Sequence, residues 1–445
     1  MDTLTEQSAQ HGQALYQRAK RLIPGGTQLL SKRPEMFAPG QWPPFFRSAK
    51  GVEVTDVDGR TFTDMTTMGI GACLLGYADP DVERAVIDRL QRGPMSSLNC
   101  PEEVELAEAL LAMHPWAKMI RYSRGGGEAM SVAVRIARAF TRRDRVAFCG
   151  YHGWHDWYLA ANLDASSDRL DGHLLPGLAP AGVPRGLAGS ALPFAYNKID
   201  ELRKIVQQHG SELAAIVMEP TRSQLPAPGF LEAVREIADK TGAVFIFDEI
   251  SVGFRLHCGG AHMHYGVTPD IAVFAKALGN GVPVAAIIGT DRVMQAAQGS
   301  FISSTFWTDG LGPAAAIAVL AKMQRINLPA HIQSIGKLYK AGIERLAAKH
   351  QLPLKVGGHD VFPAISFASD QALALQTLLT VRLLDRGFLS GAAFYPCFLH
   401  QPHHVEKFLS AADEVFAELK AAIAAGDVLS RIGGDVRHSG FSRLA

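Results

Sequence analysis

The sequence predicts an α/β protein with a large domain built on a mostly parallel sheet and a smaller α/β domain formed by both ends of the chain. Short apolar runs alternate with helical stretches between residues 119 and 289, as in parallel strands joined by covering helices. The composition turns helical after about residue 314. A chain of 445 residues, 47% of them hydrophobic, is long enough for two cores. We expect an arm and part of the small domain over 1–65, the large domain over 66–313, and the rest of the small domain over 314–445.

The first elements precede the large sheet. An amphipathic pattern around residues 8–22 predicts a helix. Residues 51–65 alternate apolar and polar side chains around Asp58-Gly59, which predicts a β-hairpin. Two more helices are expected over residues 80–92 and 102–113.

Six apolar runs of strand length follow. They are MIRYS (119–123), VAFC (146–149), AAIVME (214–219), AVFIF (243–247), IAVFA (271–275) and VAAIIG (284–289). In the last part of the chain, FPAISF (362–367) predicts a strand between helices, and residues 405–425 form an amphipathic helical pattern.

Charge and cysteine content narrow the class of function. The chain has 44 Lys and Arg against 43 Asp and Glu, so no excess charge favours nucleic acid or an anionic membrane as partner, and we expect small-molecule substrates. No run of about 18 apolar residues or signal-peptide core is present. Five cysteines without a CxxC spacing indicate a reducing compartment, so we expect a cytoplasmic protein.

Polar residues follow several of the predicted strands, where ligands bind in open parallel sheets. Gly125-Gly126-Gly127 follow the first strand and open a long helix, so their amides and the helix dipole would suit a phosphate. The structural alternative is a flexible turn that binds no ligand, which requires the same glycines. The spacing is neither a Walker A loop nor GxGxxG, which argues against a nucleotide.

Lys276 ends the run IAVFA and Asp248 ends AVFIF. A lysine that emerges from a buried strand has a lowered pKa, which favours Schiff-base chemistry. A carboxylate under a pyridine ring keeps the ring nitrogen protonated and makes the ring an electron sink. Together with the glycine loop, the pair predicts a site for pyridoxal-5′-phosphate (PLP). A buried Lys–Asp ion pair between two strands is the structural alternative.

Tyr151 follows VAFC in the segment GYHGWHDWY and suits an aromatic side chain stacked on a flat ring, while Ile250 suits the opposite face. His152, His155 and Asp156 raise the question of a metal site or a catalytic triad. No third ligand stands at a recognisable spacing and no GxSxG serine exists, so we expect no metal.

These motifs are similar to those of the class III PLP-dependent aminotransferases, and most similar to members of the glutamate-1-semialdehyde 2,1-aminomutase type. The resemblance covers most of the chain. Its segments are LIPGG (22–26), DVDGRTFTDM (56–65), GGGEAMSVAVRIARA, GYHGWHD, MEP (218–220), FDEISVGFR (247–255), YGVTPDIAVFAKALGNGVP (265–283) and SSTFW (303–307). It implies PLP fold type I, the aspartate-aminotransferase-like fold, and a homodimer whose subunits share the active site.

The resemblance also implies roles for individual residues. Lys276 would hold PLP as a Schiff base, Asp248 would bind the pyridine nitrogen, and Tyr151 and Ile250 would enclose the ring. The remaining cofactor-binding candidates are Gly126 and Gly127 at the phosphate, Thr305 reaching it from the neighbouring subunit, and Ser304, His152 and Glu219. The role of Glu219 is not assigned by the resemblance.

The sequence departs from the aminomutase at positions that help to recognise its substrate. Leu29, Lys32 and Ile70 stand where a serine, an arginine and a tryptophan are expected. Ser251 replaces a glutamine that many class III transaminases carry. The departures favour another carbonyl acceptor, sugar-derived or carbocyclic, with glutamate as amino donor, and Lys32, Arg33 or His403-His404 are candidates to contact it.

Three functions are therefore compared. The first is an aminotransferase with two half-reactions, the second is an intramolecular aminomutase, and the third is a non-catalytic PLP-binding relative. The first two differ in whether a keto acid leaves the enzyme. The complete set of Lys276, Asp248 and Tyr151 argues against the third.

Overall fold

The computed structural model describes residues 11–163, 169–173, 176–222 and 224–440. The chain forms two compact units: Pro80–Pro329, and Met1–Asp79 with Ala330–Ala445. These breaks lie later in the chain than the expected boundaries at residues 65 and 313. Helix α10 (Leu311–Arg325) packs against α2 (Pro80–Gln91) and α3 (Glu102–Met113), so it belongs with the large unit.

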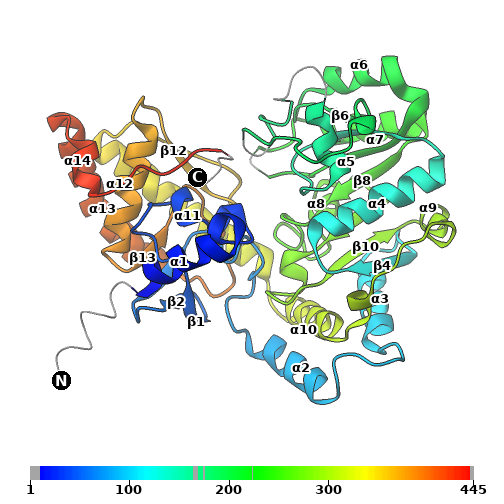
Figure 1. Ribbon diagram of the computed structural model, residues 1–445, viewed down its shortest axis with the longest axis horizontal. Helices are drawn as coiled ribbons and strands as arrows, with labels where there is room; N and C mark the ends of the chain where they lie inside the picture. Colours follow the sequence, from blue (N-terminus) through cyan, green and yellow to red (C-terminus); the bar gives the residue numbers. More distant parts are fainter. Residues whose placement is uncertain (1–10, 164–168, 174–175, 223, 441–445) are drawn as a thin grey trace. The chain divides into compact units, whose positions relative to one another are not determined.

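A seven-stranded sheet forms the centre of the large unit (Figure 1). Its strands, in spatial order, are β4 (Met119–Ser123), β10 (Ala285–Gly289), β9 (Ile271–Phe274), β8 (Val244–Asp248), β7 (Leu213–Met218), β5 (Arg145–Cys149) and β6 (Ala191–Pro193). Only β10 is antiparallel to its neighbours, so the expectation of a mostly parallel sheet is confirmed. The short edge strand β6 was not predicted.

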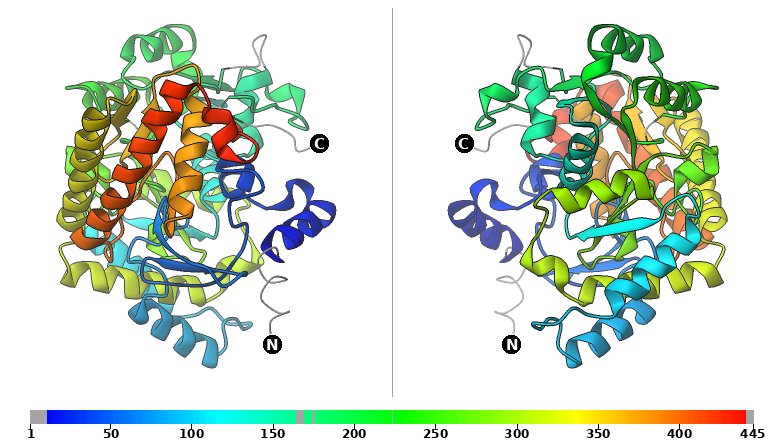
Figure 2. Two further views of the ribbon diagram at one scale, coloured as in Figure 1. Left: turned by 90° about the vertical axis from the view of Figure 1, so that its left-hand side faces the viewer. Right: turned by 90° about the vertical axis from the view of Figure 1, so that its right-hand side faces the viewer.

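Helices cover both faces of this sheet, as the alternation of strands and helices predicts (Figures 1 and 2). The apolar side of α4 (Gly126–Thr141) packs on one set of strand side chains, including Phe148 and Val217. Helices α6 (Ile199–His209) and α7 (Phe230–Thr241) contribute to a second core with the alternate side chains, such as Phe245. Three short helices complete the unit: α5 (Asp156–Leu159), α8 (Ala261–Tyr265) and α9 (Asp291–Met294).

The smaller unit has two small sheets. Strands β1 (Phe46–Lys50), β2 (Glu53–Asp56), β3 (Thr61–Met65) and β13 (Phe388–Ser390) form one, and β11 (Leu354–Gly357) pairs with β12 (Ala364–Phe367) in the other. The helices are α1 (His11–Leu22), α11 (Leu328–His350), α12 (Ala372–Leu384), α13 (Pro402–Ala425) and α14 (Val428–Ile432). The antiparallel pairing of β2 with β3 confirms the predicted hairpin.

Within the described ranges, no helix is long and apolar enough to cross a membrane.

Candidate active site

The predicted site residues of the large unit lie at one edge of its sheet. Strands β4, β5, β7, β8 and β9 all run in the same direction, so their carboxyl ends meet at that edge. Lys276, Asp248 and Glu219 stand at or just beyond three of these ends. Loops and helix N-termini converge at this edge of an open α/β sheet, which makes it the usual place for a ligand.

Lys276 lies just after the end of β9, and its backbone conformation is unusual for a residue other than glycine. Its φ is +48°, in the left-handed region, a strain that proteins retain mainly where the site requires it. The side chain is partly buried, and Nζ donates a hydrogen bond to Ser251 Oγ at 2.7 Å. Burial, and next the positive charge of Arg222, lower the pKa of the Lys276 amine from 10.5 to about 8, while Asp248 opposes the shift.

Asp248 is held in one orientation by two neighbours. Its carboxylate is 3% exposed. Oδ1 accepts the amide proton of Ile250 at 3.0 Å, and Oδ2 lies 2.8 Å from His152 Nδ1. His152 Nε2 in turn lies 3.0 Å from the backbone carbonyl of Cys149, which orients the ring. His152 therefore fixes the position of the Asp248 carboxylate.

The glycine loop after β4 presents backbone amides. The Glu128 carboxylate accepts from the amides of Arg124 and Gly125, at 2.9 and 3.3 Å. The next two amides, of Gly126 and Gly127, open the 16-residue helix α4 and have no intrahelical acceptor. The helix dipole adds partial positive charge at this point, which suits an anion.

Neighbouring side chains and backbone require glycine in this loop. A Cβ on Gly126 would lie 3.0 Å from Ile250, and one on Gly127 would lie 3.0 Å from His155. Gly153 has a φ of +104°, and a Cβ there would lie 2.8 Å from the Cα of Gly127. The loop therefore brings its backbone close to the segment that follows β5, and it leaves the amides accessible at short range.

Tyr151 and Glu219 extend the same edge. Tyr151 is partly buried against the core, with its ring edge-to-face against Tyr158 at 5.8 Å. Burial raises the pKa of the Tyr151 hydroxyl. Glu219 Oε2 lies 3.4 Å from the amide nitrogen of Tyr151, and Oε1 lies 3.3 Å from Arg222. Glu219 fits there because residue 150 is glycine, where a Cβ would lie 2.8 Å from the carboxylate.

The other candidate residues form no hydrogen bond or ion pair with this cluster in the part of the chain that the structure describes, or they belong to the other compact unit. Ser304 and Thr305 are exposed, and their backbone carbonyls accept hydrogen bonds from Trp307 and Thr308 in the same turn. The acceptor candidates Lys32, Arg33 and His403-His404 belong to the smaller unit. In the part of the chain that the structure describes, no group of three metal-ligating side chains gathers, and His155 stacks on Trp154 instead.

Arg222 and the Ser251–Lys276 hydrogen bond were not predicted from the sequence. Arg222 follows β7 by only a few residues, so the rule that identified Glu219 could also have identified it. The hydrogen bond of Ser251 depends on side-chain rotamers, for which the sequence carries no signal.

The groups of this edge fit PLP. The ring needs a lysine for covalent attachment, an acid for its nitrogen and donors for its phosphate, and Lys276, Asp248 and the Gly126 and Gly127 amides are of these types. When bound, PLP supplies an electron sink for bonds at the carbon that carries the amino group.

Comparison with known proteins agrees with this chemistry. The family model of class III aminotransferases matches residues 37–423. A 3-aminobutyryl-CoA aminotransferase of Cloacimonas acidaminovorans is 32% identical over 92% of this chain and 97% of its own. A glutamate-1-semialdehyde 2,1-aminomutase of Desulfovibrio desulfuricans is 37% identical over 74% of this chain and 76% of its own.

Solved structures share the fold and hold the cofactor. The PLP-bound FumI protein of Sphingopyxis sp. MTA144 superposes with a TM-score of 0.84 at 26% identity, over 93% of this chain and 97% of its own. A transaminase with bound PLP gives 0.80 at 26% identity, over 94% and 98%. The chain therefore belongs to the class III aminotransferases and is a PLP-dependent aminotransferase with the type I fold.

Proposed function

We propose that this enzyme moves an amino group from an external amino acid, glutamate, to a ketone or aldehyde of a biosynthetic intermediate. The observation that carries the proposal is the Lys276 amine, whose pKa of about 8 leaves a useful neutral fraction near pH 7, at the same sheet edge as the His152-supported Asp248. A neutral amine is the nucleophile that Schiff-base chemistry requires.

The residues at this edge of the sheet have separate roles in the proposed reaction. Lys276 would hold the cofactor, and its amine would act as the base that takes the proton from the amino-bearing carbon of the substrate. Ser251 accepts a hydrogen bond from this amine at 2.7 Å and orients it. Asp248, fixed by its contact with His152 at 2.8 Å, would bind the pyridine nitrogen.

Binding of the cofactor rests on the flanking loops. Tyr151 and Ile250, which both pack on the same core cluster, would enclose the ring of PLP. The amides of Gly126 and Gly127 would bind its phosphate. Glu219 lies next to the amide of Tyr151 and is a further candidate for contact with the cofactor.

The acceptor is a sugar-derived or carbocyclic oxo compound. The name of the Cloacimonas relative adds a 3-oxoacyl thioester as an alternative acceptor to be assayed. In a single-turnover screen, glutamate converts the enzyme and changes its visible absorbance, with release of 2-oxoglutarate. The carbonyl compound that restores the original spectrum is the acceptor. An enzyme that neither glutamate nor any other amino acid converts contradicts the proposal.

Intramolecular amino transfer is the second candidate, and the 37% identity to an aminomutase favours it. Leu29, Lys32 and Ile70 argue against it, since they lack the polar and shape-defining groups expected for that substrate, at about 1–3 kcal/mol per lost polar contact. Efficient conversion of glutamate 1-semialdehyde to 5-aminolevulinate, without release of a keto acid from any donor, would establish the aminomutase.

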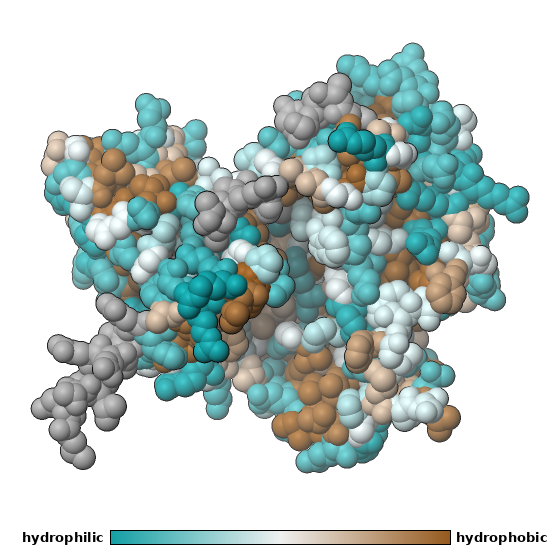
Figure 3. All heavy atoms as spheres, viewed as in Figure 1, coloured by the Kyte–Doolittle hydropathy of each residue, from teal (hydrophilic) through white to brown (hydrophobic). Residues whose placement is uncertain are grey.

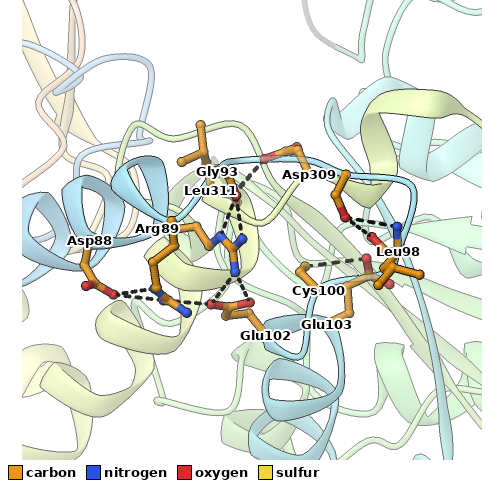
Figure 4. A network of polar contacts seen from close by, with 12 residues as sticks. Asp88, Arg89, Gly93, Leu98, Cys100, Glu102, Glu103, Asp309 and Leu311 are labelled. Carbon is orange, nitrogen blue, oxygen red and sulfur yellow. Dashed lines mark hydrogen bonds and ion pairs between the residues drawn. The ribbon is translucent and has the colours of Figure 1, made fainter.

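We also propose a homodimer in which Thr305 and Ser304 serve the partner's cofactor. Apolar side chains are exposed in the α2–α3 connection and in residues 301–306, among them Leu98 at 80% and Phe301 at 88%. Figure 3 shows an apolar area on the surface in the lower part of the large unit, where Figure 1 labels α2. Figure 4 shows Arg89 of α2 bonded to Glu102 of α3 and to the carbonyl of Gly93, which fixes the connection. A fixed, exposed apolar surface of this kind suits a protein partner. Sedimentation should give twice the 48.0 kDa chain mass.

We propose a cytoplasmic location. It is supported by the five cysteines, all of them free thiols, as in proteins of a reducing compartment.

A further inference from the structure

A cavity of about 510 Å³ opens beside the proposed cofactor site in the large unit. Its lining includes the carboxyl ends of three adjacent strands: Cys149 of β5 with Gly150 after it, Pro193 of β6, and Glu219 after β7. Figure 1 shows β6 at the α6 side of the sheet. The volume is in the range of small-molecule sites, and Phe194 contributes apolar wall.

We propose that this cavity binds an anionic end, a carboxylate or a phosphate, of the carbonyl acceptor, with Arg222 as its principal contact. The inference rests on the proposed function and names the class of its acceptor: an oxo compound with a negative charge remote from the reacting carbonyl.

The charges of the cavity favour an anion. Three basic side chains line it: Arg169, Lys198 and Arg222. Of the two acidic ones, Glu201 accepts the amide proton of Ala195 at 2.8 Å, and Glu219 is adjacent to Arg222 itself.

His173 adds a neutral donor. Its Nδ1 accepts the amide proton of Gly150 at 3.0 Å, which places the ring proton on Nε2. Burial lowers the pKa of His173 to about 4, so the ring is neutral in this tautomer near pH 7. His173 lines the cavity, and an N–H donor there suits a carboxylate or phosphate oxygen.

Arg222 connects the cavity to the reacting groups. Arg222 contacts Glu219 Oε1 at 3.3 Å, and Glu219 Oε2 lies 3.4 Å from the amide nitrogen of Tyr151. An acceptor whose carbonyl lies at Lys276 can therefore extend its charged end past Tyr151 to Arg222. The positive charge of Arg222 disfavours a cationic end in the same place, because like charges repel.

The test measures binding and turnover in the PLP-loaded enzyme, where the phosphate of the cofactor already occupies the glycine loop. Calorimetric titration uses two probes that cannot react, glutarate and glycerol 3-phosphate, and the tighter one identifies the anion. Turnover of the glutamate-converted enzyme is compared for 4-oxobutanoate and butanal, which differ in the carboxylate. The variants are Arg222→Gln and Arg222→Lys, and Arg203→Gln, an exposed arginine of α6 outside the cavity lining, is the control.

We expect Arg222→Gln to weaken the tighter probe by about 10- to 100-fold, the range of a charge-assisted hydrogen bond. It should lower the ratio of kcat/KM for 4-oxobutanoate to kcat/KM for butanal by a similar factor. Arg222→Lys should retain part of the affinity, and Arg203→Gln all of it. Equal probe affinity in Arg222→Gln and wild type overturns the proposal.

Failure of the function and failure of the site are distinguishable. If neither glutamate nor any other amino acid converts the enzyme, the proposed function fails while the probe titrations still measure the cavity. If Arg222→Gln does not load PLP, the titrations are made with Arg169→Gln instead, since Arg169 is another basic residue of the cavity lining. A loss of probe affinity in Arg169→Gln supports the site, and unchanged affinity overturns it.

Discussion

In the cofactor-free enzyme, the Lys276 amine should release its proton near pH 8. Burial and Arg222 together lower its pKa from 10.5 to about 8, a shift that corresponds to about 3 kcal/mol. At pH 7 about one Lys276 amine in ten is then neutral, against fewer than about one in a thousand at a pKa of 10.5. Lys276 is therefore primed to react with a carbonyl compound before any cofactor binds.

The assay is reductive alkylation of the cofactor-free enzyme with formaldehyde and cyanoborohydride across pH 6 to 11, followed by mass spectrometry of the peptides. Exposed Lys240 provides the internal control for the reagent. Labelling of Lys276 should rise with a midpoint near pH 8. Arg222→Gln should move this midpoint up, and Asp248→Asn should move it down, because these charges act with opposite signs. A Lys276 midpoint near 10.5 would show that burial and Arg222 do not lower the pKa of this amine.

Three further predictions concern the same edge. Asp248→Asn should fold and load PLP but lose about 10³-fold in turnover, about 4 kcal/mol, because the pyridine nitrogen loses its charge partner; near-normal turnover removes Asp248 from the mechanism. Gly153→Ala should lower stability by about 1–3 kcal/mol and weaken PLP binding, since its Cβ would meet Gly127. Gly182→Ala is the control for backbone strain alone, because Gly182 has a φ of +87° and open space where a Cβ would lie. Equal PLP affinity in Gly153→Ala and Gly182→Ala contradicts the close approach of Gly153 to Gly127. Lys276→Met should stabilise the cofactor-free enzyme at pH 7 by up to about 3 kcal/mol in urea unfolding. The pKa of Lys276 is lower in the folded than in the unfolded chain, so the unfolded chain binds more protons between about pH 8 and 10.5. Wild-type stability therefore rises through that window, and the stability gained by Lys276→Met shrinks. A gain that does not depend on pH contradicts the lowered pKa of Lys276.

The sequence was most informative where strands are buried on both faces. Runs such as AAIVM and AVFIF are apolar throughout, because every side chain of β7 and β8 is buried, and their ends located Glu219 and Asp248. The edge strands β1 and β6 were missed. Residues Phe46–Lys50 are mostly exposed and show no alternation, and β6 has only three residues.

Contacts between side chains were less predictable than their positions. His152 was expected near the cofactor from its place after β5, but its bond to Asp248 depends on the register of β5, β7 and β8. Arg222 was missed because a single arginine in a polar loop is usually solvated, and only the cavity beside it indicates a ligand. Leu29 and Ile70 belong to the other compact unit, so their relation to the substrate stays a prediction.

The central claim is that Lys276 carries the cofactor, and borohydride reduction tests it most directly. The purified protein should be yellow, and reduction should bleach it and fix PLP irreversibly to one peptide. We expect fragmentation of this peptide to place the label on Lys276, in the sequence IAVFAKALGNG. A label on another lysine, or no label on a protein that retains bound PLP, would contradict it.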